Sequence, residues 1–207
     1  MTECVILLHG LWLRGMAMNY LSRRLSAAGF DAQTFDYATV RDGIDVASKR
    51  LRELIGTFGG GKVHLVGHSL GGLVAAMIVQ RHPDLIDGRI VCLGAPLRGS
   101  AAARSLKGLP GGLAMLGHSV ELLEQGLERW DGPQELGAIA GRLPIGLGFV
   151  LGGVTAPHDG TVAVEETRLP GITDHRVIAA AHTGLVYSDP AARHTIAFLR
   201  DGRFGTA

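Results

Sequence analysis

The stretch KVHLVGHSLGG, residues 62–72, constrains the fold more than any other part of the chain. Its first half is a short apolar run, as in a buried strand, and its second half opens a helical pattern that continues to residue 82. Residues 63–80 carry no charged side chain, which also raises the question of a membrane span. Three glycines, two histidines and a change of periodicity midway favour a strand followed by a helix, with Ser69 at the joint.

Residues 67–71 match the pattern G-x-S-x-G, which between a strand and a helix places a serine on a sharp turn with its hydroxyl above the sheet. Gly67 and Gly71 remove side chains that would clash across such a turn, and Gly72 lets the helix approach neighbouring strands. The turn also directs the helix N-terminus at Ser69, where its amides and dipole favour a developing negative charge. The pattern therefore predicts a nucleophile at Ser69; an inert glycine-rich turn is the structural alternative.

Short strand-like runs alternate with longer amphipathic runs along the chain, which is typical of βαβ units and a parallel sheet. The predicted strands span residues 4–10, 30–37, 62–67, 89–96, 135–141 and 174–181, with 145–153 competing for the fifth. The predicted helices span residues 15–28, 44–58, 70–82, 120–130 and a last one that starts at Ser188 or Asp189 and ends before Gly202. We expect an α/β fold with a mostly parallel sheet of about six strands and helices on both faces. Residues 1–207 are interpreted as one domain, with a short cap-like insertion at about 98–134.

The sequence gives no sign of nucleic acid, a nucleotide phosphate or a metal ion as a partner. The chain has 207 residues and a formal net charge of +1, with no basic run for nucleic acid. Residues 56–63, GTFGGGKV, come close to a phosphate-binding loop, but Val63 stands where serine or threonine is required and the glycines precede a strand. No histidine cluster has the spacing of metal ligands, and we expect neither a metal nor a cofactor.

Nothing in the first residues fits a signal peptide, because Glu3 stands where a basic region belongs and the apolar run is short. Cys4 and Cys92 both lie in apolar strand-like runs, where buried free thiols are commoner than a disulfide. These features predict a cytoplasmic protein without a membrane span.

A serine nucleophile needs a base, which in an open α/β sheet belongs on a loop at the carboxyl ends of the strands. His175 enters the last strand at the opposite edge, and His194 lies inside the last helix, where we expect it on the solvated side. His182 directly follows the last strand and is the histidine that fits. The other histidines are interpreted as structural or surface residues: His64, His68, His82, His118 and His158.

The base in turn needs an orienting carboxylate. Asp159 lies on the long loop after the fifth strand, with Gly160 permitting a tight turn. Four other aspartates downstream of the serine fall at the far edge or in the insertion: Asp84, Asp87, Asp131 and Asp174. An ordinary Asp-Gly turn is the structural alternative for Asp159, and a polar residue before a helix is the alternative for His182.

Two backbone amides are candidates for an oxyanion hole. One is that of Leu70, directly after the serine, and the other is that of Leu11 on the loop leaving the first strand, where Gly10 lets the chain bend inward. His9 is interpreted as a brace for this loop. Trp12 and Leu13 are candidates either for the floor of an acyl pocket or for core packing, and Arg98 and Ser100 are assigned no role.

The segments VILLHGLW, GHSLGG, GAPLRGS, HDGTV and AAHTGLVYS, in this order, resemble the α/β-hydrolase superfamily, and within it the bacterial lipase-like serine esterases. The resemblance extends over essentially the whole chain. It implies Ser69 as nucleophile, His182 as base, Asp159 as the residue that orients it, and Leu11 and Leu70 as oxyanion donors. It also implies that the sheet begins at the strand that the family counts as its third.

These observations predict a hydrolase that cleaves small or lipid-like carboxylic esters through an acyl-enzyme intermediate. A thioesterase or acyltransferase with the same residues is one alternative, and a protein that binds an acyl ligand without turnover is another. The apolar segment 106–130 is interpreted as helical core packing, with a membrane-touching lid or a protein-contact surface as alternatives.

Overall fold

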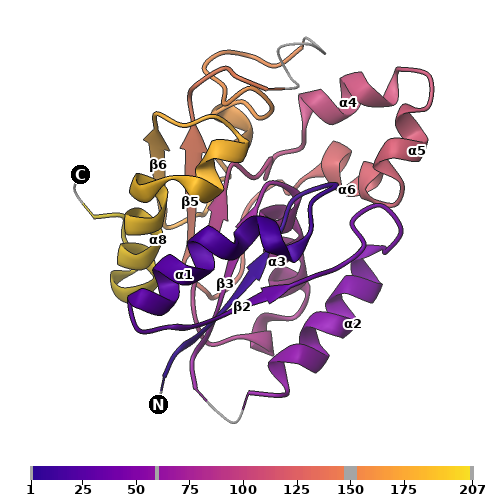
Figure 1. Cartoon of the computed structure of the whole chain (residues 1–207). Helices are drawn as coiled ribbons and strands as arrows, with labels where there is room; N and C mark the ends of the chain where they lie inside the picture. The colour runs from indigo at the N-terminus through magenta and orange to yellow at the C-terminus, as the bar shows by residue number, and fades with distance from the viewer. Residues whose placement is uncertain (1, 59–60, 147–152, 206–207) are drawn as a thin grey trace.

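Six strands form one parallel sheet in the order β2-β1-β3-β4-β5-β6, which confirms the predicted sheet (Figure 1). The computed structural model describes residues 2–58, 61–146 and 153–205. The strands are β1 (Cys4–Leu8), β2 (Asp31–Phe35), β3 (Val63–His68), β4 (Ile90–Leu93), β5 (Leu136–Gly141) and β6 (Asp174–Ile178). Every residue of β1, β3, β4 and β5 is buried, as expected for strands covered on both faces.

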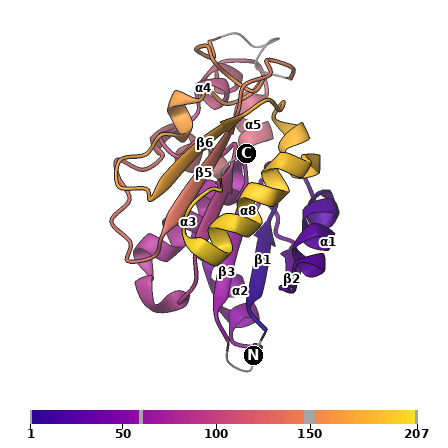
Figure 2. The ribbon, with the colours of Figure 1, turned by 90° about the vertical axis from the view of Figure 1, so that its left-hand side faces the viewer.

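Helices cover both faces of this sheet. One core layer packs α1 (Asn19–Ala27) and α8 (Asp189–Asp201) against the sheet. The other packs α2 (Ile44–Ile55) and α3 (Leu70–Arg81) against the opposite face, and Figure 2 shows the sheet between the two layers. Residues 70–79 of α3 are all buried, so the uncharged run that raised the question of a membrane span is a strand and a core helix. Within the described residues, no helix is long and apolar enough to cross a bilayer.

The last helix begins and ends where its capping residues predict. Ser188 Oγ accepts a hydrogen bond from the Ala191 amide at 3.3 Å, and Gly202 ends the helix with a φ of 71°. The prediction that His194 lies on the solvated side of this helix is wrong. Its side chain is buried and packs edge-on against Phe204.

Three short helices between β4 and β5 form the insertion, and they lie beyond the carboxyl ends of the strands (Figure 1). They are α4 (Ala101–Lys107), α5 (Gly112–Leu116) and α6 (Ser119–Gln125). The predicted helix 120–130 is wrong at its end, because Gly126 has a φ of 60° and stops the helix. Leu123 and Trp130 are nonetheless buried in the core, so part of this segment packs as expected.

Other boundaries differ from the prediction by a few residues. A 3₁₀ helix, η1 (Gly15–Met18), replaces the first turn of the helix predicted over 15–28. The remaining 3₁₀ helices are η2 (Pro83–Leu85), η3 (Glu165–Thr167) and η4 (Thr183–Tyr187). The fifth strand is the one predicted over 135–141, and the competing segment 145–153 lies mostly outside the described residues. Cys4 and Cys92 are both buried, as predicted.

Candidate active site

Ser69 occupies the turn between β3 and α3 in a backbone conformation that side chains rarely adopt. Its φ is 55° and its ψ is −125°, outside the regions favoured by L-residues. A side chain on Gly67 would overlap the backbone of Gly71, and one on Gly71 would overlap the carbonyl oxygen of Leu8. The glycines therefore allow the strand, the turn and the helix to pack closely enough to hold the serine in this strained position.

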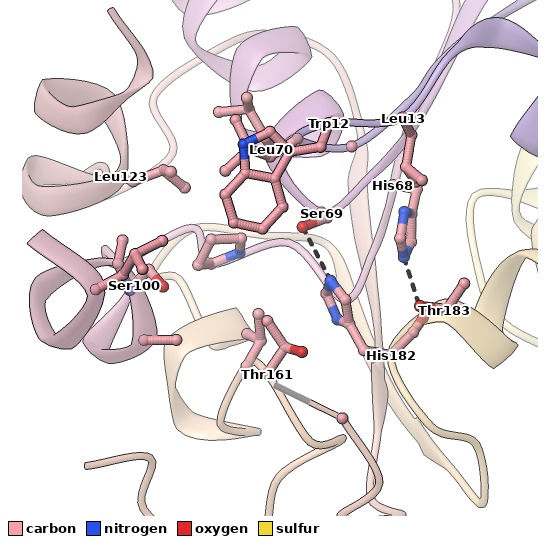
Figure 3. A pocket seen from close by; sticks show the side chains of 18 of the residues that line it. Trp12, Leu13, His68, Ser69, Leu70, Ser100, Leu123, Thr161, His182 and Thr183 are labelled. Carbon is pink, nitrogen blue, oxygen red and sulfur yellow. Dashed lines mark hydrogen bonds between the residues drawn. The ribbon is translucent and has the colours of Figure 1, made fainter. Parts of the chain in front are cut away.

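The hydroxyl of Ser69 lies at one end of a chain of hydrogen bonds. Figure 3 shows the first of them, between Ser69 and His182. His182 Nε2 is 3.0 Å from Ser69 Oγ, and His182 Nδ1 is 2.8 Å from Asp159 Oδ2. The Asp159 side chain is 1% exposed and that of His182 11%, so the contact between carboxylate and imidazole is shielded from water. This arrangement can remove a proton from the serine and stabilise the imidazolium that results.

The loops after β5 and β6 place these groups. Asp159 lies on the loop after β5, and its Oδ1 accepts hydrogen bonds from the amides of Thr161 at 2.9 Å and Val162 at 2.7 Å. His182 follows β6, and its own amide donates to the Asp159 carbonyl oxygen at 2.8 Å. Gly94, just after β4, has a φ of 54°, and a Cβ there would lie 3.0 Å from Asp159 Oδ2 and 3.2 Å from His182 Nδ1. The end of β4 thus leaves room for the carboxylate–imidazole pair.

The loop after β1 passes directly against the serine. A Cβ on Gly10 would lie 3.0 Å from Ser69 Cβ. The amides of Leu11, on this loop, and Leu70, at the start of α3, have no hydrogen-bond partner among the described residues, and both residues line the cavity next to Ser69. Such amides can stabilise a negatively charged oxygen.

His9 is completely buried and holds the same loop from behind. Its ring stacks on Tyr37 with centroids 4.7 Å apart, and its Nε2 lies 2.9 Å from Asp36 Oδ1. The Tyr37 hydroxyl donates to the His9 carbonyl oxygen at 3.0 Å. His9 makes no hydrogen bond to Ser69 or His182, which agrees with a bracing position.

A cavity of about 310 Å³ opens beside the serine, and the insertion supplies much of its wall. Leu11, Trp12 and Leu13 line it on the side of the β1 loop, so the pocket alternative for Trp12 and Leu13 agrees with their positions (Figure 3). The residues contributed by the insertion are Ser100, Ala102, Ala103, Leu106, Leu116 and Leu123. The volume is near the lower end of the usual range for ligand pockets.

The cavity lining contains no aspartate, glutamate, lysine or arginine among the described residues. Exposed apolar side chains lie on the loops and helices that supply this lining: Trp12, Leu109, Leu113, Met115, Leu143 and Ile145. The lining that the structure describes therefore offers apolar contact and no carboxylate, lysine or arginine as a countercharge.

Sequence reasoning missed the lining residues of the insertion and the contact between His68, interpreted only as a structural or surface residue, and His182. Helices α4 and α5 have seven and five residues, too short to display a helical period, although Ser100, the N-cap of α4, lies in the segment GAPLRGS. His68 is completely buried and its Nε2 lies 3.0 Å from the His182 carbonyl oxygen. Its place inside G-x-S-x-G was the available signal.

In the part of the chain that the structure describes, no three histidine, cysteine, aspartate or glutamate side chains are arranged to hold a metal ion. Burial raises the pKa of the Cys92 thiol to about 12 and that of Cys4 to about 11, which makes both poor nucleophiles at neutral pH. Ser69, in contrast, has a hydroxyl that lies beside both an imidazole and two amides without a partner among the described residues.

Comparison with known proteins identifies relatives over most of the chain. Residues 5–204 match the alpha/beta hydrolase family. An (E)-2-((N-methylformamido)methylene)succinate hydrolase of Acinetobacter baylyi is 27% identical over 99% of this chain and 80% of its own. A pimeloyl-[acyl-carrier protein] methyl ester esterase of Aeromonas salmonicida is 30% identical, but over 44% of this chain and 38% of its own.

Solved structures share the fold. The mature form of the Bacillus licheniformis lipase BlEst2 superposes with a TM-score of 0.77 at 22% identity, covering 95% of this chain and 90% of the lipase. The metagenomic carboxyl esterase MGS0156 gives a TM-score of 0.65 at 18% identity, covering 87% of this chain and 64% of its own. At these identities the likeness establishes the fold alone.

Proposed function

The chain belongs to the alpha/beta hydrolase family, and on that basis we propose that it cleaves carboxylic esters through an acyl-enzyme intermediate formed on Ser69. The observation that carries the proposal is the hydrogen-bonded series Ser69 Oγ, His182 Nε2, His182 Nδ1 and Asp159 Oδ2. Relatives named as a hydrolase and as a methyl ester esterase support the class of reaction.

In the proposed reaction, His182 accepts the proton of Ser69 as its Oγ attacks the ester carbonyl carbon. The carbonyl oxygen becomes negative and is stabilised by the amides of Leu11 and Leu70, while Asp159 stabilises the imidazolium. His182 then donates its proton to the departing alcohol. Water, deprotonated by His182, attacks the acyl carbon, the bond from this carbon to Ser69 Oγ breaks, and His182 returns the proton to Oγ as the acid is released.

We propose neutral esters with an apolar acyl group as substrates. The Acinetobacter relative is named for a succinate derivative, which carries carboxylate charges, whereas the described lining of this cavity has no lysine or arginine to pair with them. A charged acyl group would lose its hydration without compensation. The uncharged wall favours an alkyl chain, whose burial is stabilising.

We also propose that residues 1–207 act as one hydrolase domain in which α4–α6 form a small cap. The cap helices and the β1 loop contact each other at the cavity, since the Trp12 indole N–H donates to the Met115 carbonyl oxygen at 2.8 Å. Thr39 connects the two parts a second time, because it accepts a hydrogen bond from the Trp12 amide and its carbonyl oxygen accepts one from Ser119 Oγ.

The proposal is tested with a fluorophosphonate probe and p-nitrophenyl esters of increasing chain length. We expect labelling of Ser69 and a loss of at least about 10³-fold in kcat for Ser69→Ala. Ser26→Ala, on the exposed surface of α1, is the matched control and should retain full activity. Absence of labelling, or unchanged turnover by Ser69→Ala, would exclude the mechanism, and tight acyl binding without hydrolysis would favour a binding protein. A higher kcat/KM for the thioester of the same acyl chain would favour a thioesterase.

A further inference from the structure

His68 and Ser69, adjacent in the chain, both contact His182. Ser69 contacts the imidazole of His182, whereas His68 contacts its backbone, with Nε2 3.0 Å from the carbonyl oxygen. The two histidine rings also pack together, with centroids 4.8 Å apart and an angle of 43° between their planes (Figure 3). The end of β3 at His68 therefore contacts His182, the same residue that the Ser69 hydroxyl contacts.

The contact determines which nitrogen of His68 carries hydrogen. A carbonyl oxygen only accepts, so Nε2 must be the protonated nitrogen and Nδ1 carries the lone pair. Nδ1 is buried and has no hydrogen-bond partner among the described residues; a Cβ on Gly10 would lie 3.2 Å from it. A buried unpaired acceptor is unfavourable, and a phenylalanine ring would avoid it. Compared with phenylalanine, the imidazole of His68 gains one interaction, the hydrogen bond from Nε2–H to the His182 carbonyl oxygen.

His68 stays neutral while His182 takes up a proton. Burial, with a smaller contribution from the charge on His182, lowers the pKa of His68 to about 3. A neutral ring can lie beside the imidazolium form of His182 without repelling it, which a lysine or arginine at this position could not do.

The backbone of His182 is held from both sides. Its amide donates to the Asp159 carbonyl oxygen at 2.8 Å, and its carbonyl oxygen accepts from His68 at 3.0 Å and, at the longer distance of 3.3 Å, from the Leu185 amide. Because both flanking peptide groups are restrained, the imidazole is directed toward Ser69 rather than along the open cavity. A misplacement of about 1 Å at such a group can lower the rate about 100-fold.

We propose that His68 is a positioning residue for the hydrolytic reaction, and that its Nε2–H bond to the His182 backbone and its ring contact hold the His182 imidazole in line with Ser69. The proposal rests on the proposed function, because it requires His182 to act as the base for Ser69. It assigns a task to the variable position of the G-x-S-x-G turn.

Three substitutions separate the donor from the volume of the ring. His68→Gln places an amide N–H near the former Nε2, His68→Asn places it near the former Nδ1 and out of reach of the carbonyl, and His68→Phe keeps the ring without a donor. We expect His68→Gln to retain most of the wild-type kcat, and the other two variants to lose about tenfold or more in kcat with little change in KM. The rate of fluorophosphonate labelling at Ser69 should fall in parallel, and circular dichroism melting confirms that each variant is folded.

Equal kcat in His68→Gln and His68→Asn, whether both high or both low, would overturn the proposal, since only one of them keeps the bond. If His68→Phe does not fold, the comparison of His68→Gln with His68→Asn still tests whether the bond to the His182 carbonyl oxygen is needed. Failure of this proposal is distinguishable from failure of the proposed function, which would show as absent labelling of Ser69 or as retained activity in Ser69→Ala. Inactive Ser69→Ala together with fully active His68→Asn would refute the positioning role and leave the hydrolase intact.

Discussion

Asp159 contacts His182 twice, once through its side chain and once through its backbone. Its Oδ2 lies 2.8 Å from His182 Nδ1, and its carbonyl oxygen accepts the His182 amide at the same distance of 2.8 Å. The backbone bond holds the two loops together whatever the charge of the carboxylate. A change confined to the carboxylate should therefore alter chemistry more than structure.

Asp159→Asn tests this separation. The amide preserves the shape of the side chain but can donate to Nδ1, which favours the wrong tautomer of His182, so kcat should fall about 10³–10⁴-fold with KM little changed. Steady-state kinetics on a p-nitrophenyl ester measures both parameters. Asp131→Asn, at an exposed ion pair with Arg129, is the control and should behave as wild type. Retention of a tenth or more of the wild-type kcat by Asp159→Asn would contradict the assigned role.

Gly71→Ala should destabilise the fold, because the new methyl group would overlap the Leu8 carbonyl oxygen where α3 meets β1. Overpacking of this kind typically costs about 1–3 kcal/mol, and backbone has less freedom to move than a side chain. Urea denaturation followed by circular dichroism gives the free energy of unfolding. Gly56→Ala is the control, since Gly56 has a φ of −62° and its nearest contacts would be ordinary ones at 3.5 Å. Equal stabilities of the two variants would show that the close approach is not required.

Ala103→Leu should shorten the acyl chain that the cavity accepts. Ala103 lines the cavity from α4 with a buried side chain, so a larger group there occupies volume that a long chain would use. We expect kcat/KM for the decanoate ester to fall at least about tenfold relative to the acetate ester, which is the internal control. A uniform loss over the whole series would indicate general damage, and an unchanged series would place the acyl chain elsewhere.

Stability should decrease in acid partly because His68 is buried as a neutral ring. Its pKa is about 3 in the folded protein against 6.5 for the unperturbed group, so the unfolded chain binds the extra proton between these values. The free energy of unfolding therefore falls as the pH drops from 6.5 toward 3, by up to about 1.4 kcal/mol per pH unit for this one group.

His68→Gln removes the titrating group and should reduce the slope of unfolding free energy against pH by about one proton in this range. Urea titrations at several pH values measure the slope. His118→Gln, at an exposed position, is the matched control and should leave it unchanged. The same slope in His68→Gln and wild type would show that His68 is not held neutral.

The mostly parallel sheet of about six strands and the contact of Ser69, His182 and Asp159 were predictable from the pattern of strands and from the loops that follow them. Uncharged runs rich in β-branched residues predict strands that are covered on both faces. The loops that follow parallel strands lie together at the carboxyl edge of the sheet. Ser69, His182 and Asp159 meet at this edge, as predicted, and their catalytic roles remain predictions. His194 shows the limit of this reasoning, since its burial depends on Phe204 from the C-terminal segment and not on its own helix.

The insertion was harder to predict because its helices depend on tertiary contacts. Helix α6 ends at Gly126, and the chain then runs to Trp130, whose amide bonds to Pro170 in a distant loop. Helix α5 has five residues, fewer than two turns, and its end at Gly117 packs against Val40. Contacts between segments so far apart in sequence leave no periodic signal.

Helices α4–α6 contribute a wall of the cavity but none of the atoms in the series from Ser69 to Asp159. All three helices lie between β4 and β5, so they form one continuous segment of the chain. Exchanging this segment for the corresponding one from a relative would give chimaeras in which substrate preference changes while Ser69, His182 and Asp159 keep their arrangement.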